Sequence, residues 1–299
     1  MKNKSMLSGH LNLQRLLIGA AAGTLALQAR AITVDGTLDA GYGSALAVQS
    51  VNTQFGDTSY TGTPNGPDAN GSELDAAYGV ISGGNLYVFL SGAAQNNGNH
   101  INIFIADGRS GQSTLNTSVN PLNVMNGSTF SPGFSATFAV DLNDYQGTLY
   151  TDAADLVANT SGYQGAVGLS SGIGNGTLSD GITVGLNNSL ISSMGASGTA
   201  ANRAAMLAAT TGLELAIPLS LLGNPSGSIE ILADINGGGN GYLSNQFLSG
   251  LPVGSGNLGT SGFNFGSTPG EFFIVTPEPS TMMLGASGMA ALLLLRRRR

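Results

Sequence analysis

Apolar and polar residues alternate in short segments along most of the chain, and this period of two predicts β-strands. His100 to Ala106 places Ile101, Ile103 and Ile105 on one face, and Phe134 to Leu142 alternates in the same way. Further strands are predicted at Ala76 to Ser82, Leu86 to Leu90, Gly212 to Leu219, Ile229 to Ile235 and Glu271 to Val275. The first two of these form a hairpin around Gly83-Gly84-Asn85, because glycine and asparagine readily adopt the positive φ angles of tight turns.

Turns rich in glycine, asparagine and serine separate these strands, which is typical of antiparallel sheets that pack face to face. We therefore predict an all-β fold, a jelly-roll-like antiparallel β-sandwich. Thr199 to Thr210 favours helix by propensity and predicts one short helix that covers the sandwich. The glycine-rich stretches Thr61 to Ser72 and Ser161 to Gly198 are interpreted as long surface loops, so residues 32–274 form a single domain.

The N-terminal segment has the three parts of a secretory signal peptide. A basic region with Lys2, Lys4 and Arg15 precedes an apolar stretch from Leu16 to Leu27, and Ala29-Arg30-Ala31 fits the small-x-small cleavage pattern. We predict a signal helix within residues 1–31, which is removed to leave an exported chain that starts near Ile32.

The C-terminal segment, residues 275–299, also has three parts. Pro277-Glu278-Pro279 is an extended element, because each proline fixes its own φ and restricts the residue before it. The apolar run from Thr281 to Leu295 predicts a transmembrane helix, which at about 1.5 Å per residue crosses roughly two thirds of a hydrocarbon core of about 30 Å. The positive-inside bias keeps the final basic cluster in the cytoplasm, and this cluster consists of Arg296, Arg297, Arg298 and Arg299.

This order of motif, apolar run and arginine cluster closely resembles the PEP-CTERM sorting signal of exosortase substrates in Gram-negative bacteria. The resemblance implies that an exosortase-type membrane enzyme recognises Pro277, Glu278 and Pro279 while the tail is transiently anchored in the inner membrane. It also implies that the tail is then processed and the protein passes to the cell surface or the extracellular polysaccharide matrix. An ordinary C-terminal anchor that is never cleaved is the alternative interpretation.

The part of the chain between the predicted signal peptide and the C-terminal segment is strongly acidic. Between Ile32 and Thr276 the chain has two basic residues, Arg109 and Arg203, and sixteen acidic ones, a formal charge of −14. A surface this acidic repels nucleic acid and anionic lipid headgroups, so both are excluded as partners. The chain has no cysteine, which excludes disulfides, thiolate metal sites and thiol nucleophiles.

The body carries a second, weaker resemblance in three segments: Ile32 to Tyr42, with Asp35-Gly36-Thr37-Leu38-Asp39; Ala77 to Val88; and Gly212 to Leu219, with Glu214 and Ile217-Pro218. These segments are similar to carbohydrate-binding module family nine and to DOMON-like sandwiches, which implies a sandwich fold and glycan binding. Typical members hold sugars between tryptophan rings, but this chain has no tryptophan. Tyrosines would have to replace them, and the candidates are Tyr42, Tyr60, Tyr78, Tyr87, Tyr145, Tyr150, Tyr163 and Tyr242.

Few residues suit catalysis, and no catalytic residue is assigned. His100, the single histidine of the mature region, stands beside asparagines at a strand start and is expected to be a solvated loop or edge residue. A glycosidase would need two facing carboxylates, for example Asp39 or Glu73 with Glu214, but a sequence does not give their separation. The mature protein is therefore expected not to be an enzyme.

Calcium is the candidate ion, and no other cofactor is expected. Asp234, Asn236 and Asn240 place side-chain oxygens at near-alternate positions of a glycine-rich turn, a spacing that lets one loop wrap a hard cation. The turn lacks the terminal glutamate of an EF-hand loop. Asp35 with Asp39 and Asp141 with Asp144 form similar pairs, which more often cap turns.

Together these features predict an exported, non-enzymatic β-sandwich that binds glycans and is sorted to the cell envelope or the polysaccharide matrix. A structural or adhesive matrix protein without specific glycan binding is the alternative, and a secreted glycosidase is a more distant one. A pair of tyrosines exposed on one sheet face favours glycan binding, whereas a uniformly polar surface favours the matrix role. Two carboxylates that face each other across a cleft favour the glycosidase.

Overall fold

The computed structural model describes residues 31–54, 72–189, 200–260, 263–267 and 271–277. The chain divides into two units, Met1–Ala31 and Ile32–Arg299, and every element named below belongs to the second. The predicted signal helix and transmembrane helix fall outside the described residues. Within the ranges described, no helix is both long and apolar enough to span a membrane.

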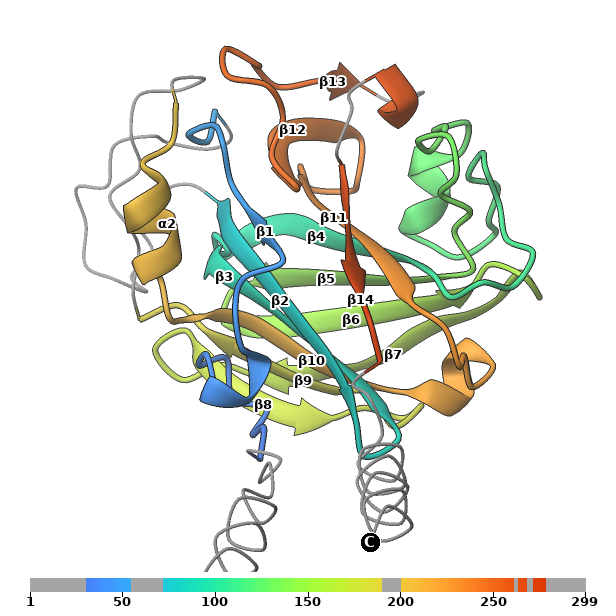
Figure 1. The fold of residues 1–299 in the computed structure, drawn as a ribbon, viewed down its shortest axis with the longest axis horizontal. Coiled ribbons are helices and arrows are strands. Elements are labelled where there is room, and N and C mark those ends of the chain that lie inside the picture. The colour runs from blue at the N-terminus through green and yellow to red at the C-terminus, as the bar shows by residue number, and fades with distance from the viewer. Residues whose placement is uncertain (1–30, 55–71, 190–199, 261–262, 268–270, 278–299) are drawn as a thin grey trace, which may run out of the picture. The chain divides into compact units, whose positions relative to one another are not determined.

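Two antiparallel sheets form the body, as the alternating pattern predicts (Figure 1). The smaller sheet has the strand order β1 (Ala47–Val48), β2 (Glu73–Ser82), β3 (Asn85–Ala93), β10 (Gly212–Pro218), β9 (Thr183–Asn187) and β8 (Ile173–Thr177). The larger sheet has the order β13 (Gly259–Thr260), β12 (Tyr242–Leu248), β11 (Ile229–Asn236), β4 (Asn97–Ala106), β5 (Phe138–Tyr145), β6 (Thr148–Asp155) and β7 (Thr160–Gly168). A last strand, β14 (Phe272–Val275), pairs with the first half of β11, and β12 pairs with its second half.

Short helices lie between the strands, and these are η1 (Ala40–Tyr42), η2 (Leu122–Met125), α2 (Arg203–Ala208), η3 (Leu219–Leu222) and η4 (Phe265–Ser267). Helix α2 is the covering helix that the sequence predicts. The side chain of Asn202 caps it by accepting hydrogen bonds from the amides of Ala204 at 3.1 Å and Ala205 at 3.4 Å. Met206 is buried and faces the body.

The main core lies between the two sheets, where the inward-facing side chains of both are buried. Ile101, Ile103 and Ile105 point into this core from β4, as their spacing predicts. Strands β3 and β10 of the smaller sheet supply Leu86, Val88, Leu90, Leu213, Leu215 and Ile217. Because burial of one large aliphatic side chain contributes about 1.5–3 kcal/mol, this layer is the chief source of stability.

A second apolar core covers part of the outer face of the larger sheet. It lies beneath the long connection from β4 to β5, residues 107–137, and the segment that follows β12. The rings of Phe104 and Phe130 have centroids 5.1 Å apart, and those of Phe130 and Phe265 are 5.6 Å apart. This core leaves the outer face uncovered towards the turn between β5 and β6, where Tyr145 and Tyr150 are exposed.

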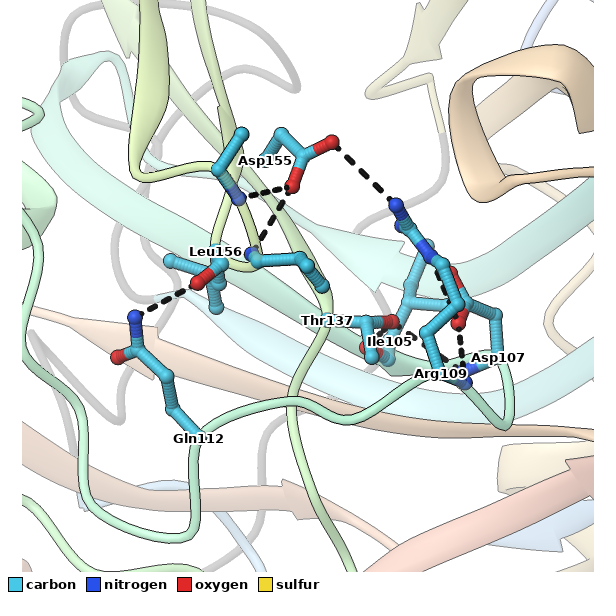
Figure 2. Close-up of polar contacts among 9 residues, drawn as sticks. Ile105, Asp107, Arg109, Gln112, Thr137, Asp155 and Leu156 are labelled. Carbon is cyan, nitrogen blue, oxygen red and sulfur yellow. Dashed lines mark hydrogen bonds and ion pairs between the residues drawn. The ribbon is translucent and has the colours of Figure 1, made fainter.

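Polar contacts hold the long connection against the sheet (Figure 2). Arg109 donates to Asp107 at 2.7 Å and to Asp155 of β6 at 3.4 Å. Gln112 donates from Nε2 to the carbonyl oxygen of Leu156 at 2.8 Å. The connection is thereby fixed to strand β6, which also carries residues of the candidate site described below.

The interpretation of residues 161–198 as a long surface loop is wrong, because all but the first residue of β7 and the whole of β8 and β9 lie within this stretch. Its glycines permit close packing of the strands. A Cβ atom at Gly174 would lie 2.5 Å from the carbonyl oxygen of Gly168, and one at Gly176 would lie 3.0 Å from a methyl group of Val167. The other stretch predicted as a loop, Thr61 to Ser72, falls almost wholly outside the described residues.

Candidate functional site

Polar side chains form two rows across the outer face of the larger sheet, perpendicular to its strands. In the first row, cross-strand pairing places Asp234, Asn102, Asp141, Asp152 and Tyr163 opposite one another in that order. Directly opposed residues of an antiparallel sheet share a face, so all five side chains lie on one side. The second row, two residues further along each strand, contains Asn236, His100, Asn143 and Tyr150.

At the end of the first row that begins with Asp234, the side chains are buried and form a polar network. Asn102 donates from Nδ2 to Asp234 Oδ1 at 3.1 Å and to Asn240 Oδ1 at 2.9 Å. Asp234 Oδ2 and Asn102 Oδ1 have no hydrogen-bond partner among the described residues. Burial raises the pKa of Asp234 to about 8, although the hydrogen bond from Asn102 opposes this shift. The structure thus brings together Asp234 and Asn240, two of the residues predicted to bind calcium.

Asn236, the third of these residues, instead braces the turn between β11 and β12. Its Nδ2 donates to the carbonyl oxygen of Asn240 at 3.2 Å, and its Oδ1 accepts from the amide of Gly237 at 3.1 Å. Within the described part of the chain, no three histidine or carboxylate side chains are grouped so that they could hold a metal ion. Calcium binding at this turn stays a prediction.

His100 is buried in β4, so the expectation of a solvated loop or edge histidine is wrong. Strand β4 begins at Asn97, earlier than predicted. His100 therefore lies within the strand, between its cross-strand partners Asn236 and Asn143. Its Nδ1 lies 2.8 Å from Asp141 Oδ1 and 3.0 Å from Oδ2, and Asn240 Nδ2 donates to Asp141 Oδ2 at 2.6 Å. These two donors fix the Asp141 carboxylate in the middle of the row.

Three exposed tyrosines form a diagonal line on the open part of the same face. Tyr163 lies in the first row on β7, Tyr150 in the second row on β6, and Tyr145 two residues beyond Asn143 on β5. Their exposed fractions are 61%, 38% and 47%. Because diagonal neighbours on adjacent antiparallel strands lie about 7–8 Å apart, the line extends over about 15 Å. We call these three residues the tyrosine diagonal.

Small residues surround the tyrosine diagonal and leave its rings accessible. Ala166 lies opposite Tyr150, and Gly168 follows on the same face of β7; both are exposed. Gly98 lies beside Tyr145, where a Cβ atom would be 3.4 Å from the ring. The face is therefore an open aromatic strip, a shape that suits an extended ligand.

Asp152 stands between two of these rings. It lies directly opposite Tyr163 and two residues from Tyr150, and it is half-buried. Its carboxylate accepts no hydrogen bond from the residues that the structure describes. Burial and, to a lesser degree, the charge of Asp141 raise the pKa of Asp152 to about 6, and His100 opposes the shift.

The tyrosines near the N-terminal segment have a structural role. Tyr42 and Tyr78 are buried against Phe89, and Tyr42 donates its hydroxyl to Glu214 Oε1 at 2.8 Å. Glu214 Oε2 accepts from the amides of Asp35 at 2.9 Å and Gly36 at 3.0 Å. Of the other candidates, Tyr87 is half-buried, Tyr242 is exposed on β12, and Tyr60 lies outside the described residues.

These contacts also bear on the carboxylate pairs considered for a glycosidase. Glu214 is fully buried with its carboxylate surrounded by three donors, and its pKa is raised by burial, with these hydrogen bonds opposing the shift. Asp39 accepts from the amide of Thr33 at 2.7 Å. Glu214 therefore joins the first segment of the body to β10 and has no side open to a substrate.

The sorting motif follows the last strand of the fold directly. Val275 is buried at the end of β14 and packs on Gly79, where a Cβ atom would come within 2.5 Å of the valine side chain. Thr276 and Pro277 are exposed. The other motif residues, Glu278 and Pro279, and the basic cluster Arg296, Arg297, Arg298 and Arg299 fall outside the described residues.

Comparison with known protein families supports the interpretation of the tail. The model of the PEP-CTERM protein-sorting motif matches residues 275–299. Searches of the curated proteins and of the solved structures returned no significant match. The chain therefore carries a PEP-CTERM sorting signal, by which an exosortase sorts exported proteins of Gram-negative bacteria to the cell envelope.

Proposed function

We propose that the body is a non-enzymatic glycan-binding domain whose ligand lies along the tyrosine diagonal. The observation that carries this proposal is the alignment of Tyr145, Tyr150 and Tyr163 on one open sheet face. Aromatic rings offer flat apolar surfaces that cover the apolar face of a sugar, and a hydroxyl that can hydrogen-bond. The row of rings suits a linear polysaccharide better than a single small sugar.

The sheet beneath the rings favours binding, because the pairing of its strands already fixes the backbone positions of the three tyrosines and little backbone freedom is lost when the ligand docks. Asp141 is fixed by His100 and Asn240, so the strand that carries Tyr145 is braced on the same face beside the rings. A sugar that covers one ring face removes on the order of 50 Å² of apolar surface from water, which contributes about 1.2 kcal/mol, or roughly eightfold in affinity.

Sorting then determines where the domain works. After export, the tail anchors the chain in the inner membrane for a time, and an exosortase-type enzyme acts at Pro277, Glu278 and Pro279. The released or transferred domain resides at the cell surface or in the extracellular polysaccharide matrix, where glycans are abundant. A structural or adhesive matrix protein without specific glycan binding is the second candidate, and the tyrosine diagonal favours the first.

The test is affinity electrophoresis of the full-length protein, purified in detergent, through gels that contain a neutral β-glucan, chitosan or alginate. We expect retardation by at least one polysaccharide. Replacement of both Tyr150 and Tyr163 by alanine should weaken binding by at least tenfold, whereas Tyr242→Ala, an exposed tyrosine of β12, should not. Unaltered mobility in every gel would favour the structural matrix role.

A further inference from the structure

We infer that the glycan bound along the tyrosine diagonal carries free amino groups, which pair as ammonium ions with Asp152. This inference rests on the proposed function and names the class of polysaccharide. It follows from the charge of the face, the accessibility of the Asp152 carboxylate and the position of that carboxylate between two rings.

The face carries carboxylates and no lysine or arginine among its described residues, and its one histidine, His100, is buried against Asp141. Asp152 and Asp141 lie opposite each other on β6 and β5. The body has two basic residues: Arg109 is paired with Asp107 and Asp155, and Arg203 begins α2, which contacts β1 and β2 of the smaller sheet. The body as a whole has a formal charge of −14, so a polysaccharide with carboxylate or sulfate groups is repelled.

The Asp152 carboxylate is available to a cation from outside. It is half-buried and accepts no hydrogen bond from the described residues, whereas Asp141 opposite it is buried and has two donors. The raised pKa of Asp152 reflects burial next to the charge of Asp141. An ammonium group at this point lowers the pKa of Asp152 again, because an opposite charge favours the ionised carboxylate. A neutral sugar would bury this carboxylate further without a counter-charge.

The neighbouring rings favour the same group. Tyr163 lies directly opposite Asp152, at a Cα separation of about 5 Å, and Tyr150 lies about 7 Å away along β6. A cation within about 6 Å of a ring centroid is attracted by the negative face of the ring. An ammonium group on a sugar stacked on Tyr150 or Tyr163 is therefore within reach of the ring and of the carboxylate together.

The experiment compares two hexasaccharides that differ only at nitrogen, glucosamine hexamer and N-acetylglucosamine hexamer, by titration calorimetry with the full-length protein in detergent. Measurements are made at about pH 6.5, where an amine with a pKa of about 7.7 keeps its proton. We expect the glucosamine hexamer to bind at least tenfold more tightly, and its affinity to fall as salt is added.

Variants then assign the preference to one residue. Asp152→Asn should reduce the affinity for glucosamine hexamer by about three- to tenfold and leave the affinity for the acetylated hexamer unchanged. Asp152→Glu keeps the charge and should keep the preference, and Asp180→Asn, in the turn between β8 and β9, is the matched control. Equal binding of the two hexamers, or an unchanged preference in Asp152→Asn, overturns the inference but leaves glycan binding intact. Absence of binding by both hexamers, with all polysaccharide gels negative, overturns the proposed function as well.

Discussion

The buried carboxyl group of Asp234 should make the folded protein less stable as pH rises, and replacement by asparagine should remove this effect. Asp234 is completely buried on β11 and accepts one hydrogen bond, from Asn102, while its second oxygen has no partner in the described residues. Asparagine has nearly the same shape and no charge. Its oxygen can keep the bond from Asn102 Nδ2, and its amide can face the unpartnered Asn102 Oδ1.

The size of the effect follows from the pKa of about 8 in the folded state. An unfolded aspartate has a pKa of about 3.9, and each pKa unit corresponds to about 1.4 kcal/mol. Between these two values the folded protein binds the proton that the unfolded chain releases, so stability is greatest below about pH 4 and is lost as pH rises to about 8. The full loss is on the order of 5 kcal/mol, a large part of the 5–15 kcal/mol typical of a domain.

Urea denaturation of the wild type and Asp234→Asn, followed by circular dichroism at several values from about pH 5 to 9, measures this loss. Asp144 and Asp152 also have raised pKa values of about 6, but they titrate in both proteins and cancel in the difference. We expect the advantage of the variant to grow by several kcal/mol and to level off above about pH 8. Parallel curves for the two proteins would refute the reasoning, and a wild type that gains stability from calcium at high pH while the variant does not would establish the predicted calcium site.

Three further predictions concern the rest of the fold and the tail. Glu214→Gln places an amide where the carboxylate accepts from Asp35, Gly36 and Tyr42, so it should destabilise the body by about 1–3 kcal/mol in urea denaturation; a change equal to that of the control Glu230→Gln, at a half-buried glutamate of β11, would contradict the structural role. Gly79→Ala should cost about 1–3 kcal/mol because the new methyl group meets Val275, and Val275→Ala in the same chain should restore part of the loss; independent, additive effects would show that the two positions do not touch. Replacement of Pro277, Glu278 and Pro279 by alanine should leave the full-length protein in the inner membrane fraction, and normal release of this variant would exclude processing at the motif.

The sequence predicts the strands with the most regular apolar alternation and misses several others, among them β6 and β12 and the glycine-rich β7 and β8. Strands β4, β10 and β11 are built on isoleucine and leucine at every second position, so their existence and inward faces follow from the pattern. Strand β8, with the sequence Ile-Gly-Asn-Gly-Thr, has the composition of a turn. It forms a strand because its glycines fit against Gly168 and Val167, a contact that local propensity does not contain.

The candidate site was less accessible to prediction, because it depends on register. Asp234 and Asn240 are close in sequence, and both accept a hydrogen bond from Asn102 Nδ2. Their partner Asn102 is more than a hundred residues away, and only the pairing of β4 with β11 brings it between them. The tyrosine diagonal likewise requires the pairing of three strands, including an irregularity between β6 and β7 at Thr151 and Asp152.

The contacts of Glu214 join segments of the body that lie far apart in the sequence. The first segment of the body is held by a residue 178 positions later, and the last strand, β14, pairs with β11 and ends next to the sorting motif. Pairings this distant in sequence form slowly, because the loop between them must close first. A chain emerging from its N-terminus across the membrane cannot complete this domain until β14 has passed through. If the chain is exported from its N-terminus as proposed above, we expect the domain to close only once β14 has crossed, shortly before the sorting signal that follows this strand reaches the membrane.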